Sequence, residues 1–404
     1  MTAIARRIVV ARALRGFVDG LVSVLLAGYL TRLGFSPFQV GAIVTGTLLG
    51  SAALTMALGL VAHRLPLQRV LLGSAVLMLA TGIGFFGLQS FWPLLVVAVL
   101  GTLNPSGGDV SAFLPAEQAA LAATTPDPQR ARAFARYNVA GTLAGAFGAL
   151  AAAVPALVAM RTGLPLVAVE RWGFAVYAAT ALIILAIYFA APALPEGHGA
   201  AERRPLARSR RIVVQLSVLF SIDSFGGGFV VQSLLVLWLH QRFALSLATM
   251  GTVFFAAGLV GALSQFLSPL LAARIGYVRT MVYTHLPANL FLIIAGLVPS
   301  APVAVAFLLL RAAFSQMDVP ARQAYVMAVV PPGERPAAAS VTNVPRSLAS
   351  AIPPLLTGML LDRSTFGWPL VIGGTLKAVY DVLLLLQFRA HMPEEQHQDA
   401  KRTA

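Results

Sequence analysis

Long apolar runs, separated by short polar segments, follow one another along the whole chain. Each run has about 20 residues or more, which is the length that an α-helix needs to cross roughly 30 Å of hydrocarbon. The ten-residue alternation of a membrane β-barrel does not occur. The pattern therefore predicts an all-α membrane protein with twelve transmembrane helices, at residues 8–33, 38–62, 69–89, 92–121, 133–159, 172–193, 212–239, 247–273, 279–299, 301–328, 337–361 and 369–388.

The second half of the chain repeats the first. Residues 115–146 and 320–351 match at a constant offset of 205 positions, with the identical pairs Pro115/Pro320, Gln118/Gln323, Pro126/Pro331, Arg130/Arg335, Asn138/Asn343, Val139/Val344 and Leu143/Leu348. A charged segment, residues 194–211, separates six predicted spans from six. We therefore expect an N-terminal bundle of residues 1–193, a cytoplasmic linker of residues 194–211 and a C-terminal bundle of residues 212–404.

The composition agrees with a membrane protein. The chain is 58% hydrophobic and 11% charged, with a mean hydropathy of +0.81, and a soluble globule would need far more polar surface. The net charge of +14 comes mostly from arginines in alternate loops, the signature of cytoplasmic loops. We expect a multi-pass protein of a bacterial-type cytoplasmic (inner) membrane, with both termini cytoplasmic. Its basic loops would contact the lipid bilayer rather than a nucleic acid.

Several kinds of chemistry are not expected. The chain has no cysteine, which excludes disulfides, thiolate metal sites and cysteine nucleophiles. Its six histidines lack metal-ligand spacing, so we expect no metal site and no cofactor. A membrane-embedded enzyme or a transport-dead sensor remains a remote alternative. An enzyme would normally carry a cluster of histidine, cysteine or metal ligands, and a sensor would normally carry a soluble domain.

A short basic turn follows the second span of each half, GLVAHRLPLQR at residues 59–69 and PLLAARIGYVR at residues 269–279. With six plus six spans and a basic linker, this turn resembles the major facilitator superfamily. The family's turn reads glycine, three residues, aspartate, arginine, one residue, glycine and then basic residues. His63 and Ala273 replace the aspartate, so its gating role is not carried over to this chain.

The resemblance implies two pseudo-symmetric six-helix bundles that rock about a central cavity lined by spans 1, 4, 7 and 10. It also implies a small-molecule substrate and no enzymatic activity. The basic gating loops would contain Arg64, Arg69, Arg130, Arg274, Arg279 and Arg335. We expect the protein to be a monomer.

Ionisable residues inside spans are costly, so each is a candidate for function. One acidic residue falls on each expected cavity helix: Asp19, Asp109, Asp223 and Asp318. A carboxylate in a poorly hydrated cavity can bind and release protons during a transport cycle. The alternative is that Asp19, Asp109 and Asp318, which fall in the cytoplasmic half, form ion pairs that only close the cavity. For Asp19 the partner would be Arg15, four residues away.

Asp223 is the strongest candidate for the coupling carboxylate. It lies near the expected midplane, about 18 Å along the helix from Arg211, in the segment FSIDSFGGGFVVQ. No cationic residue lies within one turn of it in the sequence, which would leave it free to titrate. Gln232 would extend the polar lining. The glycines at 226–228 would let a ligand approach, or would only permit tight helix packing.

The other charged residues inside spans have two interpretations. Arg311 would recognise an anionic group or, as we favour, would neutralise Asp318 or a neighbouring carboxylate. Lys377 and Asp381 are four residues apart in span 12 and are expected to pair with each other.

The pattern as a whole favours proton-coupled efflux of a small apolar or amphiphilic organic compound, as in the bacterial drug and metabolite exporter branch of the family. Span 5 carries part of the glycine motif that antiporters of the family have, with Gly141, Gly145 and Gly148. The alternative is a proton-coupled permease for a small ion or charged metabolite that uses Asp223, Arg311 and Asp318. Small-residue helix packing would explain the glycines equally well.

Overall fold

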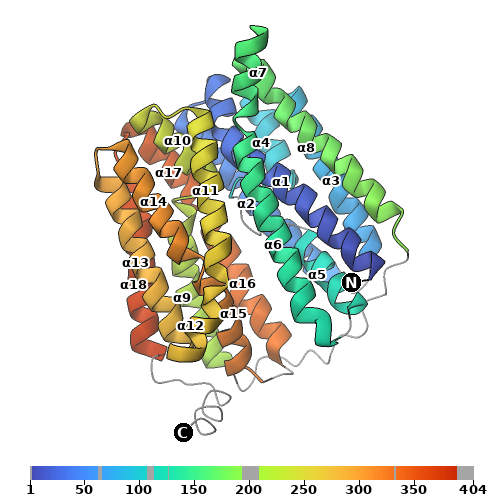
Figure 1. The fold of residues 1–404 in the computed structure, drawn as a ribbon, viewed down its shortest axis with the longest axis vertical. Helices are drawn as coiled ribbons and strands as arrows, with labels where there is room; N and C mark the ends of the chain where they lie inside the picture. Colours follow the sequence, from blue (N-terminus) through green and yellow to red (C-terminus); the bar gives the residue numbers. More distant parts are fainter. Residues whose placement is uncertain are drawn as a thin grey trace. The chain divides into compact units, whose positions relative to one another are not determined.

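The computed structural model describes residues 2–61, 66–106, 113–125, 127–192, 209–331 and 334–388. Three of the sequence expectations lie outside these ranges: Asp109, Arg64 and most of the expected linker. The side chains of Arg130 and Arg335 are also outside the described part. Within it, all regular structure is helical (Figure 1).

The helices follow the predicted spans closely. Those of the first half are α1 (Ala3–Arg32), α2 (Pro37–Val61), α3 (Leu67–Gly87), α4 (Phe91–Leu100), α5 (Phe113–Thr124), α6 (Asp127–Ala151), α7 (Val154–Thr162) and α8 (Leu166–Phe189). Those of the second half are α9 (Arg210–Gly228), α10 (Gln232–Phe243), α11 (Leu247–Gln265), α12 (Leu267–Ile275), α13 (Tyr277–Leu297), α14 (Ala301–Ser315), α15 (Asp318–Val329), α16 (Arg335–Ala351), α17 (Pro353–Arg363) and α18 (Trp368–Phe388). In the described ranges, nine helical stretches are long and apolar enough to cross a membrane.

Several predicted spans consist of two helices rather than one. The break between α16 and α17 lies at Ile352, immediately before Pro353 and Pro354, and the break between α14 and α15 precedes Pro320. Proline has no backbone N–H to donate and crowds the preceding turn, so it interrupts a helix. The break after α9 follows the run of three glycines at 226–228, which weaken a helix.

Internal contacts divide the chain into two compact units. Unit 1 contains Met1–Gly199, Val231–Gly258 and Pro354–Thr365, and unit 2 contains Ala200–Val230, Leu259–Pro353 and Phe366–Ala404. Two segments of the second half, Val231–Gly258 with α10 and Pro354–Thr365, thus belong to unit 1 together with the first half. The division at residues 194–211 expected from the sequence stays a prediction.

Helix α1 is the centre of unit 1, where it packs against α6 and α8. The backbones of α1 and α6 touch at glycines: a Cβ on Gly16 would lie 2.5 Å from the carbonyl oxygen of Gly141, and one on Gly20 would overlap the carbonyl of Gly145. Gly148 meets the backbone of Phe17 in the same way. The span 5 glycines therefore allow close helix packing.

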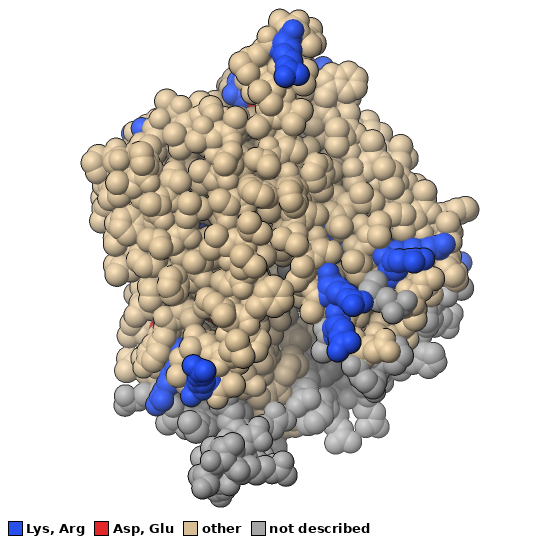
Figure 2. All heavy atoms as spheres, in the orientation of Figure 1, with Lys and Arg blue, Asp and Glu red and all other residues tan. Residues whose placement is uncertain are grey.

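The core of unit 2 is formed by α9, α13, α15 and α18, through buried residues such as Phe220, Met281, Tyr325 and Tyr380. The outside of the protein is apolar, as a lipid-facing surface requires; Trp92, Met160 and Phe189 are among its exposed side chains. On the face drawn in Figure 2, most of the described surface is uncharged, and the lysine and arginine side chains lie in a few separate groups.

Candidate functional site

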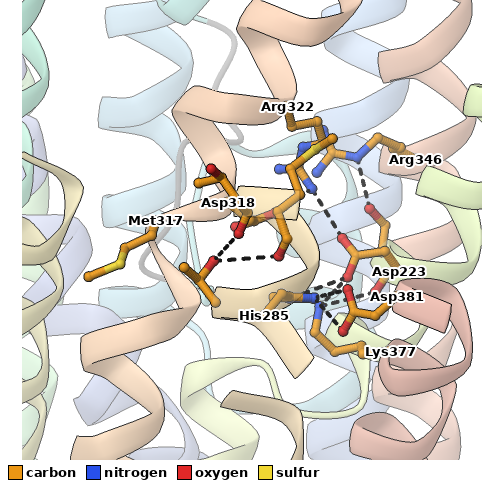
Figure 3. Close-up of polar contacts among 12 residues, drawn as sticks. Asp223, His285, Met317, Asp318, Arg322, Arg346, Lys377 and Asp381 are labelled. Atoms are coloured by element: carbon orange, nitrogen blue, oxygen red, sulfur yellow. Dashed lines mark hydrogen bonds and ion pairs between the residues drawn. The ribbon is translucent and has the colours of Figure 1, made fainter. Parts of the chain in front are cut away.

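A group of buried charged side chains lies inside unit 2. We call it the Asp223 network; its members are Asp223, His285, Asp318, Arg322, Lys377 and Asp381 (Figure 3). They come from α9, α13, α15 and α18, which pack together. Burying charges in an apolar interior is expensive unless they are paired, so the pairing decides what each residue can do.

Asp223 is at the centre of the network and is only 4% exposed. Its Oδ1 accepts a hydrogen bond from Lys377 Nζ at 2.5 Å, and its Oδ2 accepts one from Arg322 at 3.2 Å. Gly226, one turn further along α9, allows this approach, because a Cβ there would lie 2.7 Å from the Lys377 side chain. The glycine run thus brings α18 close enough to place an ammonium group on Asp223.

Asp318 begins α15 because Pro320 interrupts the predicted span 10. A carboxylate in the first turn of a helix is favoured by the exposed N–H groups there. Ser268 donates to the carbonyl of Met317 at 2.6 Å, next to the break. Arg322, one turn after Asp318, contacts its carboxylate at 3.2 Å and so joins Asp318 to Asp223.

His285 on α13 lies between two carboxylates. Its Nδ1 is 2.9 Å from Asp381 Oδ1, and its Nε2 is 3.7 Å from Asp223 Oδ1. Asn289 holds the other oxygen of Asp381 with a 2.8 Å hydrogen bond from Nδ2. In the described ranges, no three acidic or histidine side chains are grouped as metal ligands would be. His285 thus connects α13 to Asp381 on α18 and to Asp223 on α9.

Two sequence expectations about this region are wrong. Asp223 is not free of cationic partners, because Lys377 and Arg322 both bind it. Lys377 pairs with Asp223 rather than with Asp381, whose partners are His285 and Asn289. Spacing along one helix brings side chains near each other. Because α18 packs against α9 and α13, Lys377 instead contacts Asp223 on α9, and Asp381 contacts His285 on α13.

The arginine that contacts Asp318 is Arg322. Arg311 interacts electrostatically with Asp223, a neighbouring carboxylate, so its expected neutralising role stays a prediction. Arg311 lies half-buried in α14, and its Nε has no hydrogen-bond partner among the described residues. Arg346 of α16 donates from Nε to Ser224 at 3.0 Å and from a terminal nitrogen to Asn343 at 3.5 Å, both neutral groups. Within the described part, neither arginine forms an ion pair with a carboxylate.

Unit 1 contains a second buried ion pair, which the sequence analysis missed. Arg15 of α1 donates two hydrogen bonds to Glu117 of α5, at 2.5 and 2.7 Å, and Glu117 is 0% exposed. Tyr137 and Tyr188 also donate to this carboxylate. The signal was available, since Glu117 is an ionisable residue inside a predicted span and is the repeat mate of Arg322 at the offset of 205.

Two other candidates, Asp19 and Gln232, lie in unit 1. Asp19 is buried, is hydrogen-bonded to Asn104, and interacts electrostatically with Arg15 and Arg12. The guanidinium of Arg15 bonds to Glu117 instead of forming the simple pair with Asp19 that the sequence suggested. Gln232 donates to Ser23 at 2.9 Å and so also lies in unit 1.

Comparison with known proteins now decides the family. The sequence profile of the Major Facilitator Superfamily matches residues 8–312 and 224–403. The chain belongs to this superfamily. It is therefore a secondary transporter in a membrane and not an enzyme, and the fold class expected from the sequence is confirmed.

This major facilitator protein is similar to known proteins over nearly its whole length. An uncharacterized membrane protein of Saccharomyces cerevisiae is 26% identical over 408 residues, which is 91% of this chain and 90% of the yeast protein. The inward-open xylose transporter XylE of E. coli has a TM-score of 0.76 at 16% identity, covering 98% and 99% of the two chains. An inward-facing bacterial homolog of the human lysosomal transporter Spinster has a TM-score of 0.74 at 16% identity, covering 96% of each chain. These solved structures show the fold alone.

Three of the expected gating arginines of this major facilitator protein are described by the structure. Arg69 lies in the first turn of α3, Arg274 in the last turn of α12 and Arg279 in the first turn of α13. All three are exposed at helix ends, where basic residues contact lipid head groups or neighbouring loops. Their role in gating stays a prediction.

Proposed function

We propose that this major facilitator protein is a proton-coupled exporter of a small apolar or amphiphilic organic compound and works by alternating access. The observation that carries the proposal is the Asp223 network. Its six ionisable residues lie buried together inside one unit. A buried ion pair contributes little stability compared with well-packed apolar residues, so such a cluster in a membrane protein points to a role in moving charge.

The apolar character of the rest of the protein supports an apolar or amphiphilic substrate. Sugar binding would need many neutral hydrogen-bonding groups, whereas the buried polar groups described here are mostly paired with each other. The span 5 glycines no longer support export, because packing against α1 accounts for them. The proposal that transport is outward therefore rests on the apolar interior of the protein, which has few fixed charges.

A second candidate is supported by Arg311 and Arg346. Neither forms an ion pair with a carboxylate of the described residues, although both interact electrostatically with Asp223. A half-buried guanidinium that forms no ion pair is costly, and an anionic ligand would supply a direct partner. This favours a charged metabolite, with Asp223, Arg311 and Asp318 as the site. An amphiphilic compound with an anionic head would satisfy both candidates.

We further propose that the transporter is a monomer in a bacterial-type cytoplasmic membrane, with both termini and the linker in the cytoplasm. The support is the arginine distribution among the loops. Reporter fusions after Pro128, Arg204 and Gly333 should report a cytoplasmic location, and fusions after Ser90, Thr162 and Ser300 an external one. A reversed pattern would contradict this orientation.

Reconstituted protein would test the coupling and the substrate class together. Proteoliposomes containing a pH-sensitive dye should show proton movement when a suitable compound is added, and liposomes without protein should not. A panel of neutral, cationic and anionic amphiphiles would be compared at equal concentration. A response limited to anionic compounds would select the second candidate. Compound transport without any proton movement would contradict proton coupling.

A further inference from the structure

We propose that His285 is the proton-binding site of this transporter, with Nε2 as the atom that takes up the proton and Asp223 as the group that holds the protonated ring. The inference rests on the proposed proton coupling. It moves the proton from the carboxylate that the sequence favoured to an imidazole on a neighbouring helix.

Asp381 determines which ring nitrogen carries hydrogen when the imidazole is neutral. Its two oxygens lie 2.9 and 3.2 Å from His285 Nδ1. An ionised carboxylate can only accept hydrogen bonds, so Nδ1 must be the donor. The amide nitrogen of Asn289 lies 3.2 Å from Nδ1 but 2.8 Å from Asp381 Oδ2, and the shorter contact assigns that amide to the carboxylate.

The hydrogen on Nδ1 leaves Nε2 with a free lone pair in the neutral ring. This nitrogen is directed at Asp223 Oδ1, 3.7 Å away. In the neutral ring, a lone pair therefore faces a carboxylate oxygen, and no hydrogen bond forms between them. A proton on Nε2 would convert this contact into an ion pair, and the imidazolium would then donate to two carboxylates on two helices.

Asp223 itself is less suited to take the proton. Both of its oxygens already accept hydrogen bonds from cations, Oδ1 from Lys377 and Oδ2 from Arg322. A proton on Asp223 would remove the negative charge that both cations bind. Nε2 of His285 is a nearby acceptor with an unused lone pair in the neutral ring.

The charges around the ring can be counted helix by helix. Asp223 lies on α9, Asp318 and Arg322 lie on α15, and Lys377, Tyr380 and Asp381 lie on α18. The groups joined by ion pairs around the ring are three carboxylates and two cations: Asp223, Asp318 and Asp381, with Arg322 and Lys377. A neutral imidazole leaves one negative charge in excess, and an imidazolium balances it.

Two arginines lie further out and oppose the proton. Arg311 of α14 and Arg346 of α16 interact electrostatically with Asp223 but form no ion pair within the described part of the chain. Their positive charge disfavours an imidazolium nearby. An anionic substrate group at these arginines would remove that opposition, which would link substrate binding to proton binding.

Proton binding can be tested without knowing the substrate. A rapid pH drop outside proteoliposomes should give a transient current as protons enter a site within the membrane. His285→Gln should abolish this transient, and His240→Gln, at the exposed end of α10, should retain it. A full transient from His285→Gln would overturn the assignment. No transient from the unmodified protein would instead contradict proton coupling itself.

Nitrogen NMR provides a second measurement that does not alter the network. A variant with the other five histidines changed to glutamine keeps only His285; these are His63, His198, His240, His391 and His397. With ¹⁵N-labelled histidine, the neutral ring should carry hydrogen on Nδ1, and lowering the pH should protonate Nε2. A neutral ring with hydrogen on Nε2, or a ring that does not titrate, would refute the proposal.

Discussion

Replacing Asp223 with asparagine should abolish proton-driven transport and markedly lower the stability of the protein. The substitution leaves the ammonium of Lys377 and the guanidinium of Arg322 beside a neutral amide in a buried site. Removing one partner of a buried ion pair costs about 3–5 kcal/mol, because the remaining charge is not compensated. Thermal unfolding in detergent, followed by fluorescence, would measure the loss of stability, and the dye-loaded proteoliposomes would measure transport.

Two further variants separate stability from function. Asp223→Asn combined with Lys377→Met removes a carboxylate and a cation together, so most of the lost stability should return while transport stays absent. Asp362→Asn, at the exposed end of α17, should change neither property. A fully active and stable Asp223→Asn variant would contradict the role proposed for the network.

Glu117→Gln should destabilise the protein to a similar extent, about 3–5 kcal/mol, through unit 1. Arg15 is 2% exposed and would lose the carboxylate that accepts both of its hydrogen bonds. The matched control is Glu170→Gln, whose partner Arg32 is 30% exposed. Water can hydrate Arg32, so the control should lose much less stability. Equal shifts of the unfolding midpoint in the two variants would contradict the argument from burial.

The buried ion pairs of the two units lie on equivalent spans of the repeat. In unit 1, a cation on α1 binds a carboxylate on α5, and in unit 2, a carboxylate on α9 binds a cation on α15. Glu117 and Arg322 are repeat mates in the segments PAEQ and PARQ. In each half, an ion pair therefore joins the first span to the fourth. The cation lies on the first span in the first half and on the fourth span in the second half. The repeat was readable from the sequence, but the pairing required the packing.

Much of the fold could be predicted because it depends on local properties of the chain. The length of each apolar run sets the length of a membrane helix, and Pro320, Pro353 and the glycines at 226–228 mark the places where helices break. The candidate site was predicted in part. Asp223 and Asp318 do lie in one network, joined by Arg322, whereas Asp19 and Gln232 lie in unit 1.

The amino-acid sequence alone was sufficient for the helical membrane fold, the internal repeat and the list of costly buried charges. Which of these charges meet was decided by tertiary packing. Lys377 and Asp223 are 154 residues apart, and His285 and Asp381 are 96 apart. Spacing along a helix relates a residue only to neighbours three or four positions away. Partners on other helices depend on how those helices pack, and Gly226 on α9 is one small residue that allowed this contact.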